Sequence, residues 1–226
     1  MPKDDTQPLT LPLSEAGPVS ALLTAPADAV ACYVFAHGAG AGMAHPFMAS
    51  LAGELAHRRI ASLRYQFPFM ERGSKRPDAP TVAQAAVRAA VAEARRRLPG
   101  LPLFAGGKSF GGRMTSQAQA NSPLEDVKGL AFVGFPLHPA GKPGRERAVH
   151  LADVQCPMLF MQGTRDALAD MGLLRTVLSS LGKRASLAVF DDADHAFHVR
   201  VRSGTTDAAV LSALADTMVE WFVSVG

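Results

Sequence analysis

Short, almost wholly apolar runs alternate with helix-like segments along most of this chain. The run VACYVFA over residues 30–36 has the composition of a strand that is buried on both faces of a parallel sheet. Further strands are predicted at residues 60–67, 101–105, 129–135, 157–163 and 186–190, and helices around residues 47–55, 81–98, 171–182 and 206–225. This alternation predicts an α/β fold with a mostly parallel, doubly wound sheet and helices on both faces.

The N-terminal segment is predicted to add a hairpin to this sheet. LTLPL (9–13) and VSALLT (19–24) both have strand composition, and EAGP between them is the predicted turn. Residues 1–8 are expected to form a flexible polar leader. No internal repeat or linker interrupts the remainder, so residues 1–226 are predicted to form a single domain.

The composition argues against several classes of protein. Apolar residues make up 48% of the 226 residues and charged residues 19%, which is typical of a globular domain. The 23 Lys and Arg against 20 Asp and Glu leave too small a surplus for a nucleic-acid-binding surface. Cys32 and Cys156 have no spacing that suggests a disulfide framework. No signal peptide is recognised and no apolar stretch approaches the roughly 20 residues of a membrane span, so we expect a cytoplasmic protein without a membrane partner.

The loops that follow the predicted strands are where a ligand site is expected, because ligands of such sheets bind at the carboxyl ends of the strands. The loop AGGKSFGGR over residues 105–113 has two interpretations. A phosphate-binding loop, G-x-x-x-x-G-K-[ST], requires glycine where Pro102 stands, so this interpretation fails. A nucleophile elbow, G-x-S-x-G between a strand and a helix, is satisfied by Gly107, Ser109 and Gly111.

Two further loops supply partners for Ser109. A serine hydroxyl is a weak nucleophile until a base accepts its proton, and that base needs an orienting carboxylate. Asp166 and His195 each follow the end of a predicted strand, in the chain order serine, acid, histidine. Ser109, Asp166 and His195 are therefore predicted to form a catalytic triad. Asp170 is the main rival for the acid, but it lies at the start of the next predicted helix.

Backbone N–H groups near Ser109 are predicted to form an oxyanion hole, which stabilises the negatively charged oxygen of an acyl-transfer intermediate. One donor is expected to be the N–H of Phe110, which follows the nucleophile. The other is expected from HGAGAG at residues 37–42, whose glycines let the backbone turn an N–H toward the substrate. Ala39 is the predicted donor, with Gly38 and Gly40 as alternatives.

These motifs resemble those of a known superfamily. From about Val30 onward the chain resembles the α/β-hydrolase superfamily, and in size its small, lid-poor members of the dienelactone-hydrolase type. AHGAGAGMAHPF, RYQFPFME, GGKSFGGR, GFPLHPAGKP and DADHAFHV resemble more narrowly a branch with testis-expressed proteins and a hydrolase-like subunit of the NSL chromatin complex. The resemblance implies the α/β-hydrolase fold, and for some members of that branch a scaffold role. Dienelactone hydrolases use a cysteine nucleophile, so Ser109 argues against that particular reaction.

Three cations near the predicted site are candidate substrate-binding residues. Lys108 and Arg113 flank the elbow, and Arg64 is expected in a loop at the same end of the sheet. They predict tolerance of a negatively charged acyl group; the alternative is that they are solvated charges on the rim.

Histidines near the predicted site have structural as well as functional interpretations. The ring of His37 is expected to fix the glycine-rich loop. His45 and His138 are expected near the mouth of the site, as surface residues or substrate contacts.

Neither a metal nor another cofactor is predicted. His195 and His198 lie among aspartates of one loop (Asp191, Asp192 and Asp194), but no distant ligand completes a metal shell.

The segment between the predicted strands at 129–135 and 157–163 is too rich in proline for a helical cap. Pro136, Pro139 and Pro143 with two glycines are typical of an ordered loop. We therefore expect an open site suited to small acyl esters or thioesters. Two functions remain open: a serine hydrolase that forms an acyl-enzyme intermediate, and a hydrolase-fold binding or scaffold protein without catalytic activity.

Overall fold

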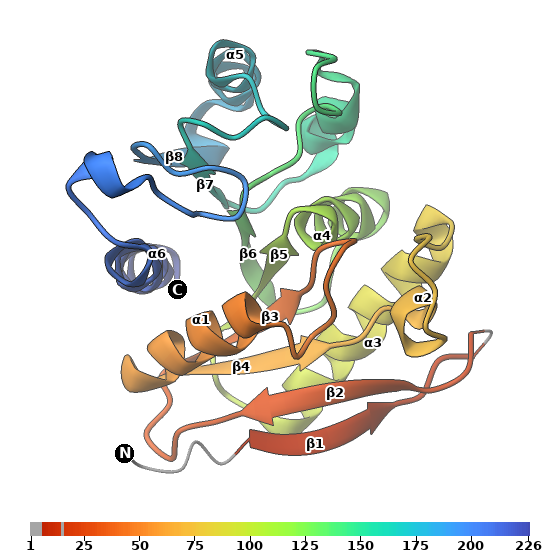
Figure 1. The fold of residues 1–226 in the computed structure, drawn as a ribbon. Helices are drawn as coiled ribbons and strands as arrows, with labels where there is room; N and C mark the ends of the chain where they lie inside the picture. Colours follow the sequence, from red (N-terminus) through yellow and green to blue (C-terminus); the bar gives the residue numbers. More distant parts are fainter. Residues whose placement is uncertain (1–5, 15) are drawn as a thin grey trace.

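The computed structural model describes residues 6–14 and 16–226 and contains the predicted alternation of strands and helices (Figure 1). The strands are β1 (Thr6–Leu11), β2 (Val19–Thr24), β3 (Ala31–Ala36), β4 (Ile60–Tyr65), β5 (Leu103–Lys108), β6 (Val127–Val133), β7 (Met158–Gly163) and β8 (Ala185–Phe190). The α-helices are α1 (Pro46–His57), α2 (Pro68–Glu71), α3 (Pro80–Arg97), α4 (Phe110–Asn121), α5 (Met171–Leu181) and α6 (Asp207–Val225). The 3₁₀ helices are η1 (Glu146–Asp153), η2 (Gly182–Arg184) and η3 (Val201–Ser203).

Within the described residues, eight strands form one sheet in the order β1-β2-β4-β3-β5-β6-β7-β8. From β4 through β8 the neighbouring strands are parallel, whereas β1 and β2 are antiparallel to their neighbours. The predicted mostly parallel sheet is thus confirmed. β4 and β5 pair with opposite edges of β3, so the winding direction reverses there. The loops after β3 and β5 therefore meet at the point where such sheets bind ligands.

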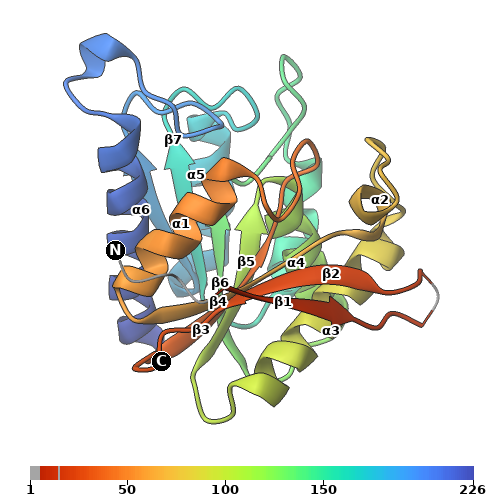
Figure 2. The same cartoon turned by 60° about the horizontal axis from the view of Figure 1, so that its bottom comes forward.

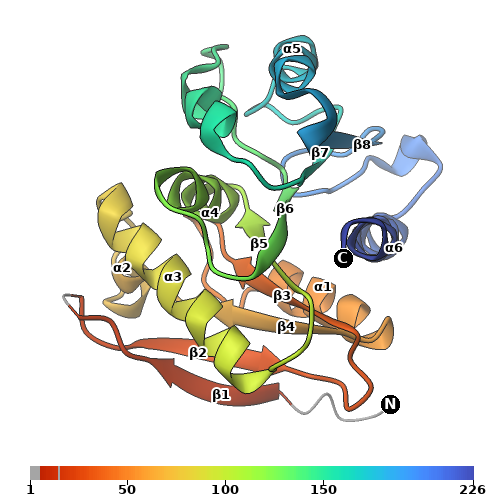
Figure 3. The same cartoon turned by 180° about the vertical axis from the view of Figure 1, so that it is seen from behind.

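Helices cover both faces of the sheet (Figures 2 and 3). On one face, α1 and α6 bury side chains such as Leu51 and Leu214. On the other face, α3, α4 and α5 bury Val87, Met114 and Leu174. The two apolar layers enclose the parallel strands, which explains the almost wholly apolar sequence of β3.

The predicted strand at 101–105 differs from the observed β5. The glycines after Ala105 have the composition of a turn, yet β5 continues through them to Lys108. Pairing with β3 on one edge and β6 on the other extends the strand, because both neighbours satisfy its backbone groups. A side chain at Gly106 would place its Cβ 1.8 Å from the carbonyl oxygen of Ala131, so only glycine fits there.

The predicted N-terminal hairpin is confirmed, with β1 and β2 paired from Thr6 opposite Thr24 to Leu11 opposite Val19. The flexible leader expected at residues 1–8 is contradicted at residues 6–8, which belong to β1 because they pair with β2. Residues 1–5 and 15 lie outside the described residues.

Contrary to expectation, α6 is long and apolar enough to cross a membrane, by length and composition alone. Six of its residues are buried in this fold (Val210, Leu214, Ala215, Met218, Trp221 and Phe222). These six side chains pack against the sheet and α1, whereas Val223 is exposed.

No large cap covers the sheet in the described part of the chain. The segment between β6 and β7, expected to be a loop, also contains η1, which packs against α4. This eight-residue 3₁₀ helix buries Ala148 and Leu151, so it contributes to the core instead of forming a separate lid.

Candidate active site

Ser109 lies on a sharp turn between β5 and α4. Its φ of 51° and ψ of −115° lie outside the regions that non-glycine residues prefer, a strained conformation found at functional sites. The flanking glycines permit the turn. A Cβ at Gly107 would lie 2.5 Å from the carbonyl oxygen of Ala36, and a Cβ at Gly111 would lie 2.5 Å from that of His37. The turn thus presses against the end of β3, which requires glycine on both sides of Ser109.

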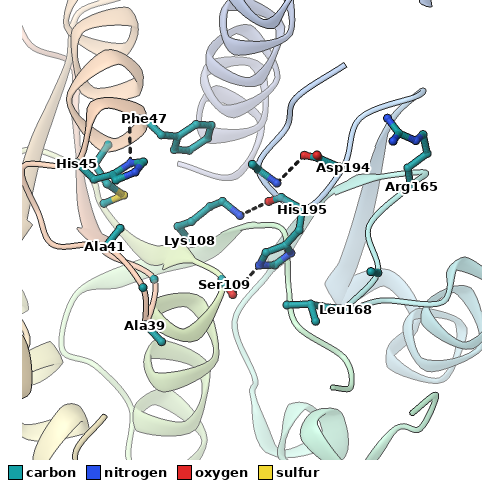
Figure 4. A pocket seen from close by; sticks show the side chains of 15 residues that line it. Ala39, Ala41, His45, Phe47, Lys108, Ser109, Arg165, Leu168, Asp194 and His195 are labelled. Carbon is teal, nitrogen blue, oxygen red and sulfur yellow. Dashed lines mark hydrogen bonds between the residues drawn. The ribbon is translucent and has the colours of Figure 1, made fainter. Parts of the chain in front are cut away.

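His195 lies on a tight loop after β8. A bridge between Ala193 and Val199 closes the loop, and Oδ1 of Asp194 accepts hydrogen bonds from the N–H groups of Ala196 and His198. The loop places Nε2 of His195 2.8 Å from Oγ of Ser109 (Figure 4).

Asp166 lies beyond the end of β7, and Oδ2 of its buried carboxylate is 2.7 Å from Nδ1 of His195. Its Oδ1 accepts a hydrogen bond from the N–H of Leu168 at 2.8 Å. The loops of Asp166 and His195 lie in close contact, since a Cβ at Gly163 would be 2.3 Å from the carbonyl oxygen of Ala193. The structure therefore brings the three predicted side chains into one hydrogen-bonded series.

Gln162 also belongs to this arrangement, although the sequence reasoning missed it. Its side-chain amide donates to Oδ2 of Asp166 at 2.5 Å, and its Oε1 accepts from the N–H of Phe135 at 3.0 Å. Gln162 is fully buried near the end of β7. A glutamine in an otherwise apolar buried strand was the available signal, because buried amides need hydrogen-bond partners.

Asp170, the rival acid, has a different place. Its Oδ1 accepts from the N–H of Leu173 at 2.8 Å and caps α5. His138, expected near the mouth of the site, is instead buried beneath the loop after β7 that carries Asp166 and Asp170, here called the acid-bearing loop. Nε2 of His138 accepts from the N–H of Asp170, and Nδ1 donates to the carbonyl of Pro139. The expected surface or substrate-contact role of His138 is therefore wrong, because the acid-bearing loop covers its ring.

His37 anchors the glycine-rich loop after β3, as expected. Nε2 of the buried ring accepts from the N–H of Phe67 at 2.9 Å, so Nδ1 carries the proton and donates to the carbonyl of Gly38 at 2.7 Å. Burial lowers the pKa of His37 to about 4. The ring is therefore neutral near pH 7 and serves as a fixed support.

A cavity of about 630 Å³ opens beside Ser109. The loop after β3 lines one side with Gly38, Ala39 and Gly40. The first turn of α1 and the acid-bearing loop line other parts, and the exposed His45 lies at its edge. The lining of this cavity is largely apolar, so it suits the carbon skeleton of a small molecule.

The three candidate substrate-binding cations occupy different environments. Lys108 lines the cavity and is partly buried. Arg113 lies outside the cavity lining, with its guanidinium 5.9 Å from the ring centroid of Phe110. Arg64 is 5% exposed in β4 and donates to the carbonyl of Met43, so its expected place in a loop is wrong. The strand predicted at residues 60–67 is observed as β4, which ends at Tyr65 and therefore keeps Arg64 inside the sheet.

No cluster of three or more His, Cys, Asp or Glu side chains within residues 6–14 and 16–226 is arranged to hold a metal ion. His198 pairs with Asp207 at 2.8 Å, and Asp192 pairs with Arg200. Two of the side chains considered for a metal shell, His198 and Asp192, therefore have partners of their own.

Comparisons with known proteins give the same fold. XC6422 from Xanthomonas campestris, described as an α/β serine hydrolase without a lid, is 23% identical, with a TM-score of 0.74 over 98% of this chain and 96% of that chain. The dienelactone hydrolase from Anabaena variabilis is 20% identical, with a TM-score of 0.77 over 98% of each chain. The esterase domain of a Rhodothermus marinus protein is 17% identical, with a TM-score of 0.72 over 96% of this chain and 97% of that chain. A family model described as an alpha/beta hydrolase domain matches residues 29–223, and the chain therefore belongs to that family.

Proposed function

We propose that this protein is a serine hydrolase that cleaves small acyl esters or thioesters through an acyl-enzyme intermediate. The hydrogen-bonded series from Ser109 through His195 to Asp166, at the edge of an open cavity, carries the proposal. Membership of the alpha/beta hydrolase family supports it. Two proteins of similar fold, described as a serine hydrolase without a lid and an esterase domain, also support it.

Proton transfer follows from the hydrogen bonds of His195. With its Nδ1–H donating to Asp166, the Nε2 lone pair accepts the proton of Ser109 Oγ as that oxygen attacks the acyl carbon. The imidazolium then returns the proton to the leaving alcohol or thiol. In the second half of the reaction, His195 activates a water molecule that cleaves the acyl–serine bond and releases the acid.

The oxyanion formed in each half requires two N–H donors. Phe110 is the first residue of α4, where N–H groups have no intrahelical acceptor. For the second donor, the carbonyl of Gly38 points to the ring of His37. In a trans peptide the C=O and N–H groups point in opposite directions, so the N–H of Ala39 points away from His37. Because Ala39 lines the cavity, we assign its N–H and that of Phe110 to the oxyanion hole.

The cavity also favours a substrate class. Small residues line the side next to Ser109, and no large cap closes the described part of the site. An open, mostly apolar cavity accepts short acyl chains without requiring the movement of a lid. Dienelactone cleavage is not proposed, because the nucleophile here is serine.

Labelling with a fluorophosphonate tests this function directly. We expect a covalent adduct on Ser109, together with hydrolysis of short activated esters, and loss of both in Ser109→Ala. The matched control is Ser116→Ala. Ser116 also lies 2.8 Å from a histidine nitrogen (Nε2 of His150), but it is buried within α4. Absence of both labelling and hydrolysis in the folded wild-type protein would favour a binding or scaffold role.

A further inference from the structure

Lys108 is the residue between Gly107 and the nucleophile turn, and its side chain crosses the cavity toward the loop of His195 (Figure 4). Its Nζ donates a hydrogen bond to the main-chain carbonyl of His195. Lys108, which directly precedes Ser109, thus contacts the backbone of His195. This is a direct link between β5 and the loop after β8.

The sheet provides no equivalent link. β6 and β7 separate β5 from β8, so main-chain pairing between the serine strand and the histidine strand is impossible. Within the histidine-bearing loop, hydrogen bonds such as that from the N–H of Phe197 to the carbonyl of Asp194 shape the loop itself. They do not determine its distance from Ser109. The hydrogen bond from Lys108 links this loop directly to the residue that precedes Ser109.

The surroundings of Lys108 support a defined role for its charge. Nζ lies 5.9 Å from the ring centroid of Phe47 and 5.5 Å from that of Phe197. Burial lowers the pKa of Lys108 to about 8, while the carboxylates of Asp166 and Asp194 act in the opposite direction. Among the described residues, Lys108 has no carboxylate within ion-pair distance. A charge removed from water without an ion-pair partner costs free energy. The charged state of Lys108 therefore requires a compensating interaction.

We propose that Lys108 is a positioning residue whose ammonium holds the loop of His195 at hydrogen-bonding distance from Ser109. This inference rests on the proposed serine hydrolase function. Lys108 therefore keeps the base in place.

Lys108→Met is the informative variant, because methionine keeps an unbranched apolar stem between the two rings but removes the donor and the charge. We expect amides of residues 191–199 to exchange with deuterium about tenfold faster, as for loss of one charge-assisted hydrogen bond. We expect kcat on a neutral ester to fall about 100-fold with KM changed less than about twofold. Lys128→Met removes an exposed lysine at the start of β6 and should change none of these.

The outcomes distinguish this role from a substrate contact. A defect confined to KM for an ester that carries a carboxylate, with the neutral ester unaffected, overturns the proposal. Wild-type exchange together with wild-type kcat on the neutral ester also overturns it. If Lys108→Met does not fold, Lys108→Gln, which keeps a donor without the charge, should still lower kcat on the neutral ester and speed the exchange of residues 191–199. Wild-type values of both in Lys108→Gln contradict the proposal. Altered exchange in a protein whose wild type hydrolyses no ester supports the positioning role while contradicting the proposed function.

Discussion

The side-chain amide of Gln162 donates a hydrogen bond to Oδ2 of Asp166, the same oxygen that lies 2.7 Å from Nδ1 of His195. The other end of the amide accepts from the N–H of Phe135, just beyond β6. One buried side chain thus fixes the carboxylate relative to the ends of two adjacent strands. It leaves the oxygen that faces the imidazole with two hydrogen-bond donors.

Gln162 should therefore affect turnover through Asp166 and not through direct contact with substrate, and its replacement should impair turnover. In Gln162→Met we expect kcat/KM on a short ester to fall about 100-fold, because the carboxylate can shift by a fraction of an ångström. We also expect the free energy of unfolding to fall by about 1–3 kcal/mol, since the Phe135 N–H loses its acceptor. Gln155→Met, at an exposed position, is the control. Steady-state kinetics and urea unfolding provide the measurements, and wild-type turnover in Gln162→Met would contradict the positioning of Asp166 by Gln162.

Two substitutions of Ser109 should separate its chemistry from its backbone strain. Ser109→Ala and Ser109→Gly should both abolish ester hydrolysis. Ser109→Gly should be more stable than Ser109→Ala, because glycine relieves a strain of about 1–3 kcal/mol at the positive φ of this turn. Urea unfolding of the two variants measures the difference. Full activity in Ser109→Ala would exclude Ser109 as the nucleophile, and equal stabilities would show that the turn is unstrained.

The acid can be identified by three amide substitutions. Asp166→Asn should lower kcat by about 10⁴-fold, as in a related triad substitution. Asp170→Asn should be much milder, since asparagine also caps helices and retains the contact with Leu173 N–H. Asp194→Asn should also be mild, because its Oδ1 still accepts from the loop amides. A larger kinetic loss in Asp170→Asn than in Asp166→Asn would show that Asp170, and not Asp166, is the acid.

Stability should depend on pH through His37. Its folded-state pKa of about 4 lies below the value of about 6.5 for an unfolded chain. Its contribution is fully present above about pH 6.5 and is lost as the pH falls toward 4, because the unfolded chain binds a proton that the folded protein excludes. His37→Gln should reduce this slope by at most about 1.4 kcal/mol per pH unit. Urea midpoints between pH 4 and 8 measure it.

The control for this pH dependence is His57→Gln, a replacement of the same kind at an exposed position. His150 adds a contribution of the same sign, since burial lowers its pKa to about 4 as well. Only the difference between wild type and His37→Gln therefore isolates His37. An identical slope in the two proteins would contradict the neutral, buried state of this ring.

Local patterns in the sequence predicted the alternation of strands and helices and the nucleophile turn. They could do so because a buried parallel strand must be apolar and because only glycine fits beside Ser109 at the end of β3. The positions of Asp166 and His195 after their strands predicted that they lie at the same end of the sheet as Ser109. These features depend on the main chain within a few residues of each motif.

Contacts between distant loops were decided by the tertiary structure alone. Phe135, which donates to Gln162, and the partners of Lys108 and His138 come from other strand ends. A strand order in which β5 and β8 are separated by two others cannot be read from local composition. Sequence patterns determine what each segment can form and which residue types reach a strand end. Only the order and register of the assembled sheet determine which of those side chains meet.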